Sequence, residues 1–259
     1  MNFAAILAGG RGTRMGNQDK PKQYLLLDKK PIIAYTVEKF LIMPEFEKVI
    51  VLCPDAWVEP TKDILRTYVG ESDRLVVIAG GERRNDTIMN AIAYIEDAFG
   101  IDDDAVLVTH DSVRPFVTYR IIKDNLDAMA SHDACDTVIP ATDTIVESVD
   151  GTVIDAVPER SRMFQGQTPQ TFKIGALKSL YASLSNEERA ILTDACKIFV
   201  LRDRKVARAR HRIQHQDHLS DRSQDRAGAP GDRGLNAEHR VSADRAAPLR
   251  DACARREHR

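Results

Sequence analysis

Short apolar runs alternate with helix-like segments along the first 140 residues, and this alternation limits the chain to a few architectures. The runs carry Val, Ile, Leu and Ala at consecutive positions, so both faces of the predicted strands are apolar. Strands of that kind belong to mostly parallel sheets that helices cover on both faces. We therefore expect an α/β fold with its functional residues at the carboxyl ends of the strands.

The period of the apolar residues predicts where the individual elements lie. Strands are predicted at residues 3–7, 49–53, 75–79, 105–109, 137–140 and 197–201. Helices are predicted at residues 31–41, 57–69, 85–99, 119–131, 174–183 and 186–192.

A glycine-rich loop follows the first predicted strand and carries the strongest functional signal. It reads Leu-Ala-Gly-Gly-Arg-Gly-Thr-Arg-Met-Gly over residues 7–16, and Pro-Lys-Gln follows at 21–23. Glycines let backbone N–H groups approach a polyphosphate closely, and the Arg and Lys side chains of this segment supply positive charge. No Walker A motif is present, and Met15 replaces the third glycine of the dinucleotide fingerprint. We expect a phosphate site of another kind, with a turn bearing solvated cations as the alternative.

Two further loops at predicted strand ends carry polar groups. In Gly-Gly-Glu-Arg-Arg-Asn-Asp-Thr, residues 80–87, the glycines favour nucleotide binding over simple capping of the next helix. Asp111 lies at the tip of another strand, where a carboxylate suits Mg²⁺ on a triphosphate. The alternative is that Asp111 pairs with Arg114 and only fixes the turn. His110 is interpreted as a structural hydrogen-bonding residue rather than as a base.

Residues 141–160 alternate apolar and polar side chains around Asp150-Gly151, which is a strong β-hairpin signal. We expect this hairpin to project from the α/β body as an arm. An arm of this composition requires a partner surface.

The length and composition limit the class of protein, its location and its use of cysteine. A chain of 259 residues with 43% apolar residues has room for an α/β enzyme. No apolar run approaches the roughly 20 residues of a membrane span, and no secretory signal is present, so we expect a cytoplasmic protein without membrane contact. The four cysteines are widely separated, which argues against a disulfide framework or a zinc site.

The last 58 residues differ from the rest of the chain. Residues 202–259 hold 14 Arg and one Lys against seven Asp and two Glu, a net charge of +6 that leaves −8 for residues 1–201. They contain no Phe, Tyr or Trp and only six Leu, Ile or Val. A segment of that composition does not build a core.

These motifs jointly resemble those of the sugar-phosphate cytidylyltransferases, the group that holds the 2-C-methyl-D-erythritol 4-phosphate and D-ribitol 5-phosphate enzymes. The resemblance covers residues 1 to about 206 and rests on Leu-Ala-Gly-Gly-x-Gly-x-Arg-Met-Gly, Pro-Lys-Gln, Gly-Gly-x-x-Arg, His-Asp-x-x-Arg-Pro and Thr-Pro-Gln in this order. It implies a Rossmann-like nucleotidyltransferase fold, CTP and a polyol phosphate as substrates, and Mg²⁺ as cofactor. It also implies a homodimer in which the hairpin arm, about 141–160, crosses to the partner.

The choice of substrate within this group depends on finer detail. The motifs at residues 110–116, 143–148 and 165–170 are closer to those of the ribitol enzymes. We therefore expect D-ribitol 5-phosphate to be converted to CDP-ribitol for wall teichoic acid or a related polymer. The alternatives are 2-C-methyl-D-erythritol 4-phosphate, for isoprenoid synthesis, and a protein that binds CTP without turnover.

The resemblance also implies roles for individual residues. Arg14 and Lys22 would be catalytic, stabilising charge as the α-phosphate is attacked. The CTP-binding residues would be Leu7, Ala8, Gly9, Gly10, Gly12, Thr13, Arg14, Lys22, Gly80, Gly81, Arg84 and Thr87. Asp111 would hold Mg²⁺ and substrate, and the sugar phosphate would contact Thr144, Arg160 and Thr193, the first two from the partner subunit. No general base is needed, because the attacking phosphate oxygen is already ionised.

The chain departs from the family after Val206, where a segment like Asn-Ile-Lys-x-Thr-x-Pro-x-Asp-Leu is missing. If each codon for residues 207–226 is shifted forward by one nucleotide, the permitted codons include a set encoding LVRGTEFNIKITYPTDLKIA, which contains that segment. We interpret residues 207–259 as an aberrant, disordered tail from a frameshift, following a cytidylyltransferase domain at 1–206. A nucleic-acid-binding tail is the alternative; Asp residues interleaved with the Arg residues and the lack of aromatic side chains argue against it.

Overall fold

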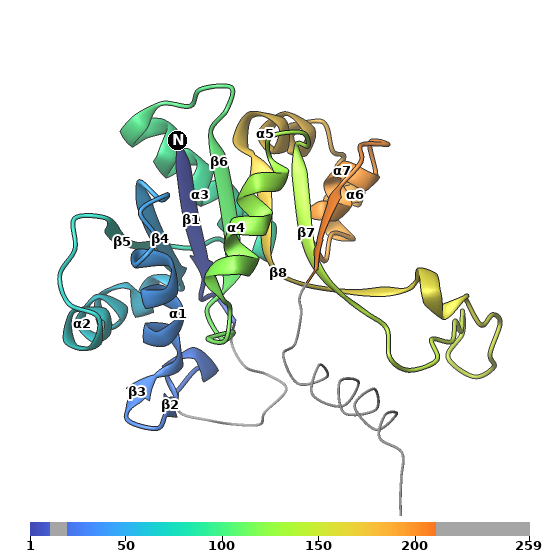
Figure 1. Ribbon diagram of the computed structural model, residues 1–259, viewed down its shortest axis with the longest axis horizontal. Coiled ribbons are helices and arrows are strands. Elements are labelled where there is room, and N and C mark those ends of the chain that lie inside the picture. Colours follow the sequence, from blue (N-terminus) through green and yellow to red (C-terminus); the bar gives the residue numbers. More distant parts are fainter. Residues whose placement is uncertain (11–19, 211–259) are drawn as a thin grey trace, which may run out of the picture. The chain divides into compact units, whose positions relative to one another are not determined.

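A computed structural model describes residues 1–10 and 20–210 of the chain (Figure 1). Seven strands form the main sheet: β1 (Asn2–Leu7), β4 (Lys48–Cys53), β5 (Leu75–Ala79), β6 (Val106–Asp111), β7 (Ala134–Pro140), β8 (Phe164–Lys173) and β9 (Ala207–Arg210). The helices are α1 (Ile32–Leu41), α2 (Val58–Tyr68), α3 (Arg84–Phe99), α4 (Tyr119–Ala128), α5 (Ile174–Ala182), α6 (Asn186–Ala190) and α7 (Cys196–Val200). A small hairpin, β2 (Leu26–Leu27) with β3 (Lys30–Pro31), precedes α1.

The main sheet is mixed and mostly parallel, with the strand order β5-β4-β1-β6-β8-β7-β9. Only β8 runs antiparallel to its two neighbours, β6 and β7. The chain builds outward from β1 to β4 and β5, and then returns to place β6 on the other side of β1. This reversal is a topological switch point, where open α/β sheets bind their ligands. The predicted α/β class is confirmed.

The core consists of two apolar layers, one on each face of the sheet. Strand β1 contributes to both, because successive side chains of a strand point to opposite faces. Ala4 and Ile6 pack with apolar residues of α1, α2 and α4, whereas Phe3 and Ala5 pack with those of α3, α5 and α7. All four of these side chains are fully buried. The apolar character of both strand faces, visible in the sequence, thus corresponds to helices on both sides.

The predicted strand at 197–201 is wrong, because this segment forms helix α7. Ile198 and Phe199 are both fully buried at consecutive positions, while Val200 is 62% exposed. Strand alternation would instead have buried residues 198 and 200 together. Phe199 stacks on Phe172 of β8 at a ring-centroid distance of 5.7 Å, and this contact fixes α7 to the sheet.

The sequence did not predict the short strands β2 and β3, nor two strands of the main sheet. Strand β8 has a polar sequence with an internal glycine and proline, a composition that is unusual in strands. Strand β9 pairs in parallel with β7 just after the predicted domain end at residue 206. The rest of the predicted tail, residues 211–259, lies outside the described residues, and its division from the domain stays a prediction.

The predicted β-hairpin arm is present between β7 and β8, and Figure 1 shows it running out from the ends of these strands. Glu147 pairs with Ala156 in an antiparallel bridge. At the tip, the Asp150 carboxylate accepts hydrogen bonds from the backbone N–H groups of Thr152 and Val153, at 2.8 and 3.3 Å. Within the described part of the chain, no helix has the length and apolar character to cross a membrane.

Alanine substitutions test the helical assignment of residues 196–200. We expect Ile198→Ala and Phe199→Ala each to lower the free energy of unfolding by about 2–5 kcal/mol, because each removes a fully buried side chain. Val200→Ala should change it by less than about 0.5 kcal/mol. Urea unfolding measures all three, and a loss at Val200 equal to that at Ile198 would indicate a strand instead.

Candidate functional site

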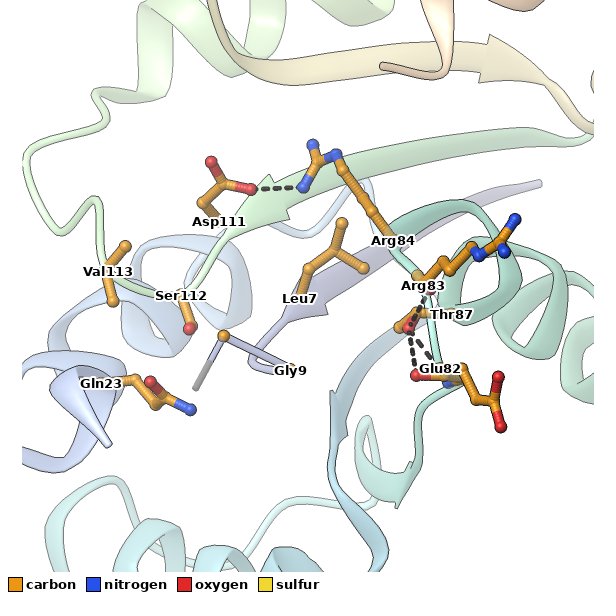
Figure 2. A pocket seen from close by; sticks show the side chains of 12 residues that line it. Leu7, Gly9, Gln23, Glu82, Arg83, Arg84, Thr87, Asp111, Ser112 and Val113 are labelled. Carbon is orange, nitrogen blue, oxygen red and sulfur yellow. Dashed lines mark hydrogen bonds and ion pairs between the residues drawn. The ribbon is translucent and has the colours of Figure 1, made fainter. Parts of the chain in front are cut away.

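A cleft of about 310 Å³ lies at the topological switch point, between the carboxyl ends of β1 and β6 and the loop that leads into α3 (Figure 2). The cleft is lined by seven residues that were predicted to belong to the site: Leu7, Gly9, Gly10, Gly81, Arg84, Thr87 and Asp111. Three segments that are far apart in the sequence therefore meet around one opening.

The two glycine pairs, Gly9-Gly10 and Gly80-Gly81, contain glycine for different physical reasons. A Cβ atom added to Gly9 or Gly10 would meet no described atom within 4 Å, so packing against the described residues does not require glycine there. A Cβ on Gly81 would lie 2.5 Å from Cβ of Asp86, so that loop requires glycine. The open backbone at Gly9 and Gly10 leaves space for a ligand group to approach the N–H groups.

Thr87 locks the second glycine loop onto helix α3. Its hydroxyl accepts a hydrogen bond from the Gly81 N–H group at 3.0 Å and donates to the Arg83 carbonyl oxygen at 3.0 Å. Gly80 packs beneath it, since an added Cβ would lie 3.2 Å from the Thr87 side chain. The wall of the cleft is therefore held by contacts within residues 80–87.

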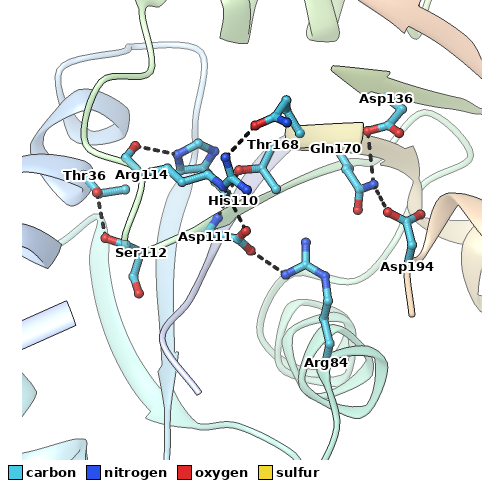
Figure 3. Close-up of polar contacts among 11 residues, drawn as sticks. Thr36, Arg84, His110, Asp111, Ser112, Arg114, Asp136, Thr168, Gln170 and Asp194 are labelled. Atoms are coloured by element: carbon cyan, nitrogen blue, oxygen red, sulfur yellow. Dashed lines mark hydrogen bonds and ion pairs between the residues drawn. The ribbon is translucent and has the colours of Figure 1, made fainter. Parts of the chain in front are cut away.

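Asp111 is held between two arginines at the mouth of the cleft. Its carboxylate accepts hydrogen bonds from Arg84 at 2.5 Å and from Arg114 at 3.2 Å (Figures 2 and 3). Burial alone would raise the pKa of Asp111, but the charge and hydrogen bond of Arg84 outweigh it and hold that pKa below its usual value. Asp111 is thus ionised at neutral pH. Asp111 pairs with Arg114, and it also lines the cleft, so its predicted role in holding Mg²⁺ stays a prediction.

The described residues of the cleft can bind Mg²⁺ only together with a ligand that supplies further oxygen atoms. Asp111 is a single carboxylate, and the described residues contain no group of three or more metal-binding side chains. Mg²⁺ commonly takes one or two carboxylates and completes its shell with substrate phosphates and water. Asp111 fits that role if the cation and phosphates take the place of one arginine contact.

Buried polar contacts that the sequence did not reveal support the loop after β6 (Figure 3). His110 bonds through Nε2 to the Arg114 carbonyl oxygen at 3.0 Å, and burial lowers its pKa to about 4. Neutral His110 is therefore the donor in this bond, which confirms its structural role. The Thr36 hydroxyl donates to the Ser112 carbonyl oxygen at 2.8 Å. On the first loop, Gln23 Nε2 donates to the Ala8 carbonyl oxygen at 2.6 Å.

A second cluster of hydrogen-bonded polar side chains connects β7, β8 and the loop before α7 (Figure 3). Gln170 of β8 donates from Nε2 to Asp136 of β7 at 3.1 Å and to Asp194 at 2.6 Å. Burial, reinforced by the charge of Asp194, raises the pKa of Asp136 to about 6. Asp194 also accepts a hydrogen bond from the Cys196 N–H group at 2.6 Å, at the start of α7. Gln170 thus anchors the loop that carries Thr193.

Comparisons with known proteins identify the family. The family model for IspD, 2-C-methyl-D-erythritol 4-phosphate cytidylyltransferase, matches residues 3–203. The chain belongs to the IspD family of sugar-phosphate cytidylyltransferases. A solved structure of the Francisella tularensis enzyme of this name is 25% identical, with a TM-score of 0.66 over 86% of this chain and 98% of that chain.

Two more distant IspD structures share the fold. The 4-diphosphocytidyl-2C-methyl-D-erythritol synthase of Anaerococcus prevotii is 21% identical, with a TM-score of 0.66 over 82% of this chain and 89% of that one. The Thermus thermophilus 2-C-methyl-D-erythritol 4-phosphate cytidylyltransferase is 19% identical, with a TM-score of 0.59 over 85% and 95%. The predicted family and nucleotidyltransferase fold are confirmed.

Several residues that the IspD resemblance implicated do not line the cleft. Lys22 is exposed at the start of a short 3₁₀ helix, and Ala8, near the start of the first loop, is buried. Thr144 and Arg160 lie in the arm, and Thr193 is exposed beside α7. The predicted residues Gly12, Thr13 and Arg14 lie outside the described residues. All of these roles stay predictions, whereas the lining residue Gln23 was missed although it belongs to the Pro-Lys-Gln motif.

The raised pKa of Asp136 predicts how stability depends on pH. The folded chain keeps this proton up to about pH 6, whereas an unfolded Asp releases it near pH 4. Stability relative to Asp136→Asn should therefore be highest below about pH 4 and fall between about pH 4 and pH 6. Urea unfolding of both proteins across this range measures the difference. The control is Asp143→Asn at an exposed position, whose unfolding free energy should vary with pH in parallel with that of the unaltered chain. A parallel pH dependence for Asp136→Asn would contradict the raised pKa of Asp136.

Proposed function

We propose that this chain transfers CMP from CTP to the phosphate of 2-C-methyl-D-erythritol 4-phosphate and releases pyrophosphate. The observation that carries the proposal is the open glycine backbone at Gly9 and Gly10, which faces a cleft at the switch point of an IspD-family sheet. Backbone N–H groups in that position suit the phosphates of a nucleotide. The names of the family model and of the structures described above support this sugar phosphate as the acceptor.

The reaction asks the protein for alignment and charge neutralisation. The acceptor phosphate oxygen attacks the α-phosphorus of CTP, the bond to the bridging oxygen breaks, and pyrophosphate leaves. Arg14 and Lys22 would stabilise the charge on the phosphates, and Arg84 would hold the Asp111 carboxylate in place. Mg²⁺, when bound by Asp111 and the phosphates, supplies further neutralisation of charge.

D-Ribitol 5-phosphate is the second candidate acceptor. The observation that favours it is the resemblance of residues 110–116, 143–148 and 165–170 to the ribitol enzymes. Strand β8 holds the whole of the third motif, and Asp111 and Arg114 belong to the first. Both acceptors are polyol phosphates, so the cleft serves either by the same chemistry.

Pyrophosphate release with each acceptor tests the proposal. With CTP and Mg²⁺, we expect release with 2-C-methyl-D-erythritol 4-phosphate and at least tenfold slower release with D-ribitol 5-phosphate. The reverse preference would move the function to CDP-ribitol synthesis. Binding of CTP without release with either acceptor would identify a nucleotide-binding protein without turnover.

We further propose that the arm forms a homodimer and carries Thr144 and Arg160 to the partner's site. The arm exposes a group of large apolar side chains: Val146, Val149, Val153, Ile154 and Val157. Several exposed apolar side chains on one short segment are typical of a surface that is buried in an assembly.

Charged substitutions in the arm test this dimer. Val149→Asp combined with Ile154→Asp should give a monomer in sedimentation equilibrium, because both side chains are more than 60% exposed in the single chain and would be buried in the dimer. We expect turnover to fall at least tenfold while CTP affinity is kept. Ile42→Asp, at an equally exposed apolar position after α1, is the control and should change neither. A dimer that survives the double substitution would contradict the proposal.

The C-terminal segment is proposed to be a frameshift product that slows turnover without abolishing it. The family match ends at residue 203, close to the predicted change at Val206. A cation next to the transferred phosphate would be lost with the missing segment. Cytoplasmic location and the absence of nucleic-acid partners likewise stay predictions.

Two measurements test the frameshift. The nucleotide sequence of the gene should encode LVRGTEFNIKITYPTDLKIA when residues 207–226 are read one nucleotide forward. The frame-restored protein should then release pyrophosphate at least tenfold faster than the chain as written. A gene unable to encode that peptide, or equal rates in the two proteins, would contradict the proposal.

A further inference from the structure

A second cavity, of about 280 Å³, lies beside the first turn of α3. It is lined by Arg83, Asn85 and Asp86 from this turn and by Tyr181 of α5, with Arg189 and Ala190 of α6. Figure 2 shows that Arg84 points toward Asp111 in the cleft, whereas Arg83 leaves the loop in the other direction. Arg83 lines both openings, whereas Arg84 lines the cleft and not this cavity.

Two buried polar atoms on residues of this cavity have no hydrogen-bond partner among the described residues. One is Oδ1 of Asn85, an acceptor on a residue that is only 5% exposed. The other is Nε of Arg189, which is a donor. A buried polar atom left without a partner costs about 1–3 kcal/mol, so each of these two atoms favours a partner that the described residues do not supply.

The charge of the cavity favours an anion. Within the described residues, neither Arg83 nor Arg189 forms an ion pair. The single carboxylate, Asp86, is already engaged: it accepts hydrogen bonds from the Tyr181 hydroxyl at 2.9 Å and from the Arg83 N–H group at 3.2 Å. The lining therefore carries two arginines and one carboxylate, and that carboxylate is hydrogen-bonded to Tyr181 and to the Arg83 backbone.

The Arg189 guanidinium is also held in place. It lies 4.8 Å from the centre of the Tyr181 ring, and its Nη2 donates to the Tyr181 carbonyl oxygen at 3.2 Å. A fixed guanidinium loses little conformational entropy on binding an anion, and its planar donors match phosphate oxygens.

We propose that this cavity is a second binding site, for a small phosphate that also carries a hydroxyl group. The phosphate oxygens would accept hydrogen bonds from Arg189 and Arg83, and the hydroxyl would donate to Asn85 Oδ1. Inorganic phosphate supplies the hydroxyl as P–OH, and a polyol phosphate monoester supplies it from carbon. The cavity shares Arg83 with the nucleotide cleft, but its other lining residues belong to it alone, and the proposal does not depend on the proposed reaction.

Charge variants of Ala190 test the site without touching the cleft, because this residue is exposed, lines the cavity and belongs to no other contact described above. Ala190→Glu and Ala190→Lys add side chains of similar size and opposite charge. In calorimetric titrations with inorganic phosphate, and separately with glycerol 3-phosphate, we expect Ala190→Glu to weaken binding at least tenfold. Ala190→Lys should bind as well as the unaltered chain or better.

Each titration is run with the nucleotide cleft saturated by CTP and again without CTP. A phosphate equivalent that still binds with CTP present supports a second site, and the tighter of the two probes identifies the source of the phosphate. Equal affinities in the Glu and Lys variants, or loss of all phosphate binding when CTP is added, would overturn the proposal. If the chain does not bind CTP, the proposed function fails, but the comparison of the two Ala190 variants still tests this cavity.

Discussion

Strand β1 lies in the sheet between β4 and β6 and is apolar on both faces, so its carboxyl end emerges at the edge where the strand order reverses. Helices on either side bury Phe3, Ala4, Ala5 and Ile6 completely. Because these contacts fix the strand, they also fix where the backbone turns into Gly9 and Gly10. The position of the cleft therefore follows from the packing of a single strand.

The electrostatics of the cleft depend on a balance around Asp111. One carboxylate accepts hydrogen bonds from two arginines, and neutral, buried His110 adds no charge to the group. The two guanidinium groups beside Asp111 suit a polyphosphate, while the ionised carboxylate remains available to a cation that arrives with it. Hydrogen bonds from Thr36 and His110 hold the loop that follows Asp111. Because this loop is already ordered, ligand binding does not incur the entropic cost of ordering it.

The sequence predicted those parts of the fold that apolar periodicity determines. Strands buried on both faces and amphipathic helices stand out, and the cleft residues Gly9, Gly81 and Asp111 follow the ends of such strands. Strand β8 is hidden because its partners β6 and β7 stabilise a polar sequence that has little strand preference of its own. Helix α7 was mistaken for a strand because five residues are too few for periodicity to separate the two. The Asp136–Gln170–Asp194 contacts join residues up to 34 positions apart, and no local pattern reveals them.

The most direct test of a nucleotide site at Gly9 and Gly10 is the affinity of the double variant Gly9→Ala/Gly10→Ala for CTP with Mg²⁺. An added Cβ meets no described atom within 4 Å at Gly9 or Gly10, so the melting temperature of the double variant should not fall; the control Gly175→Ala replaces a helical glycine on α5 and should keep or slightly raise it. If backbone N–H groups hold the phosphates, CTP affinity should fall at least tenfold in the double variant and stay constant in the control. Equal CTP affinity in all three proteins, or no CTP binding by the unaltered chain, would contradict the account.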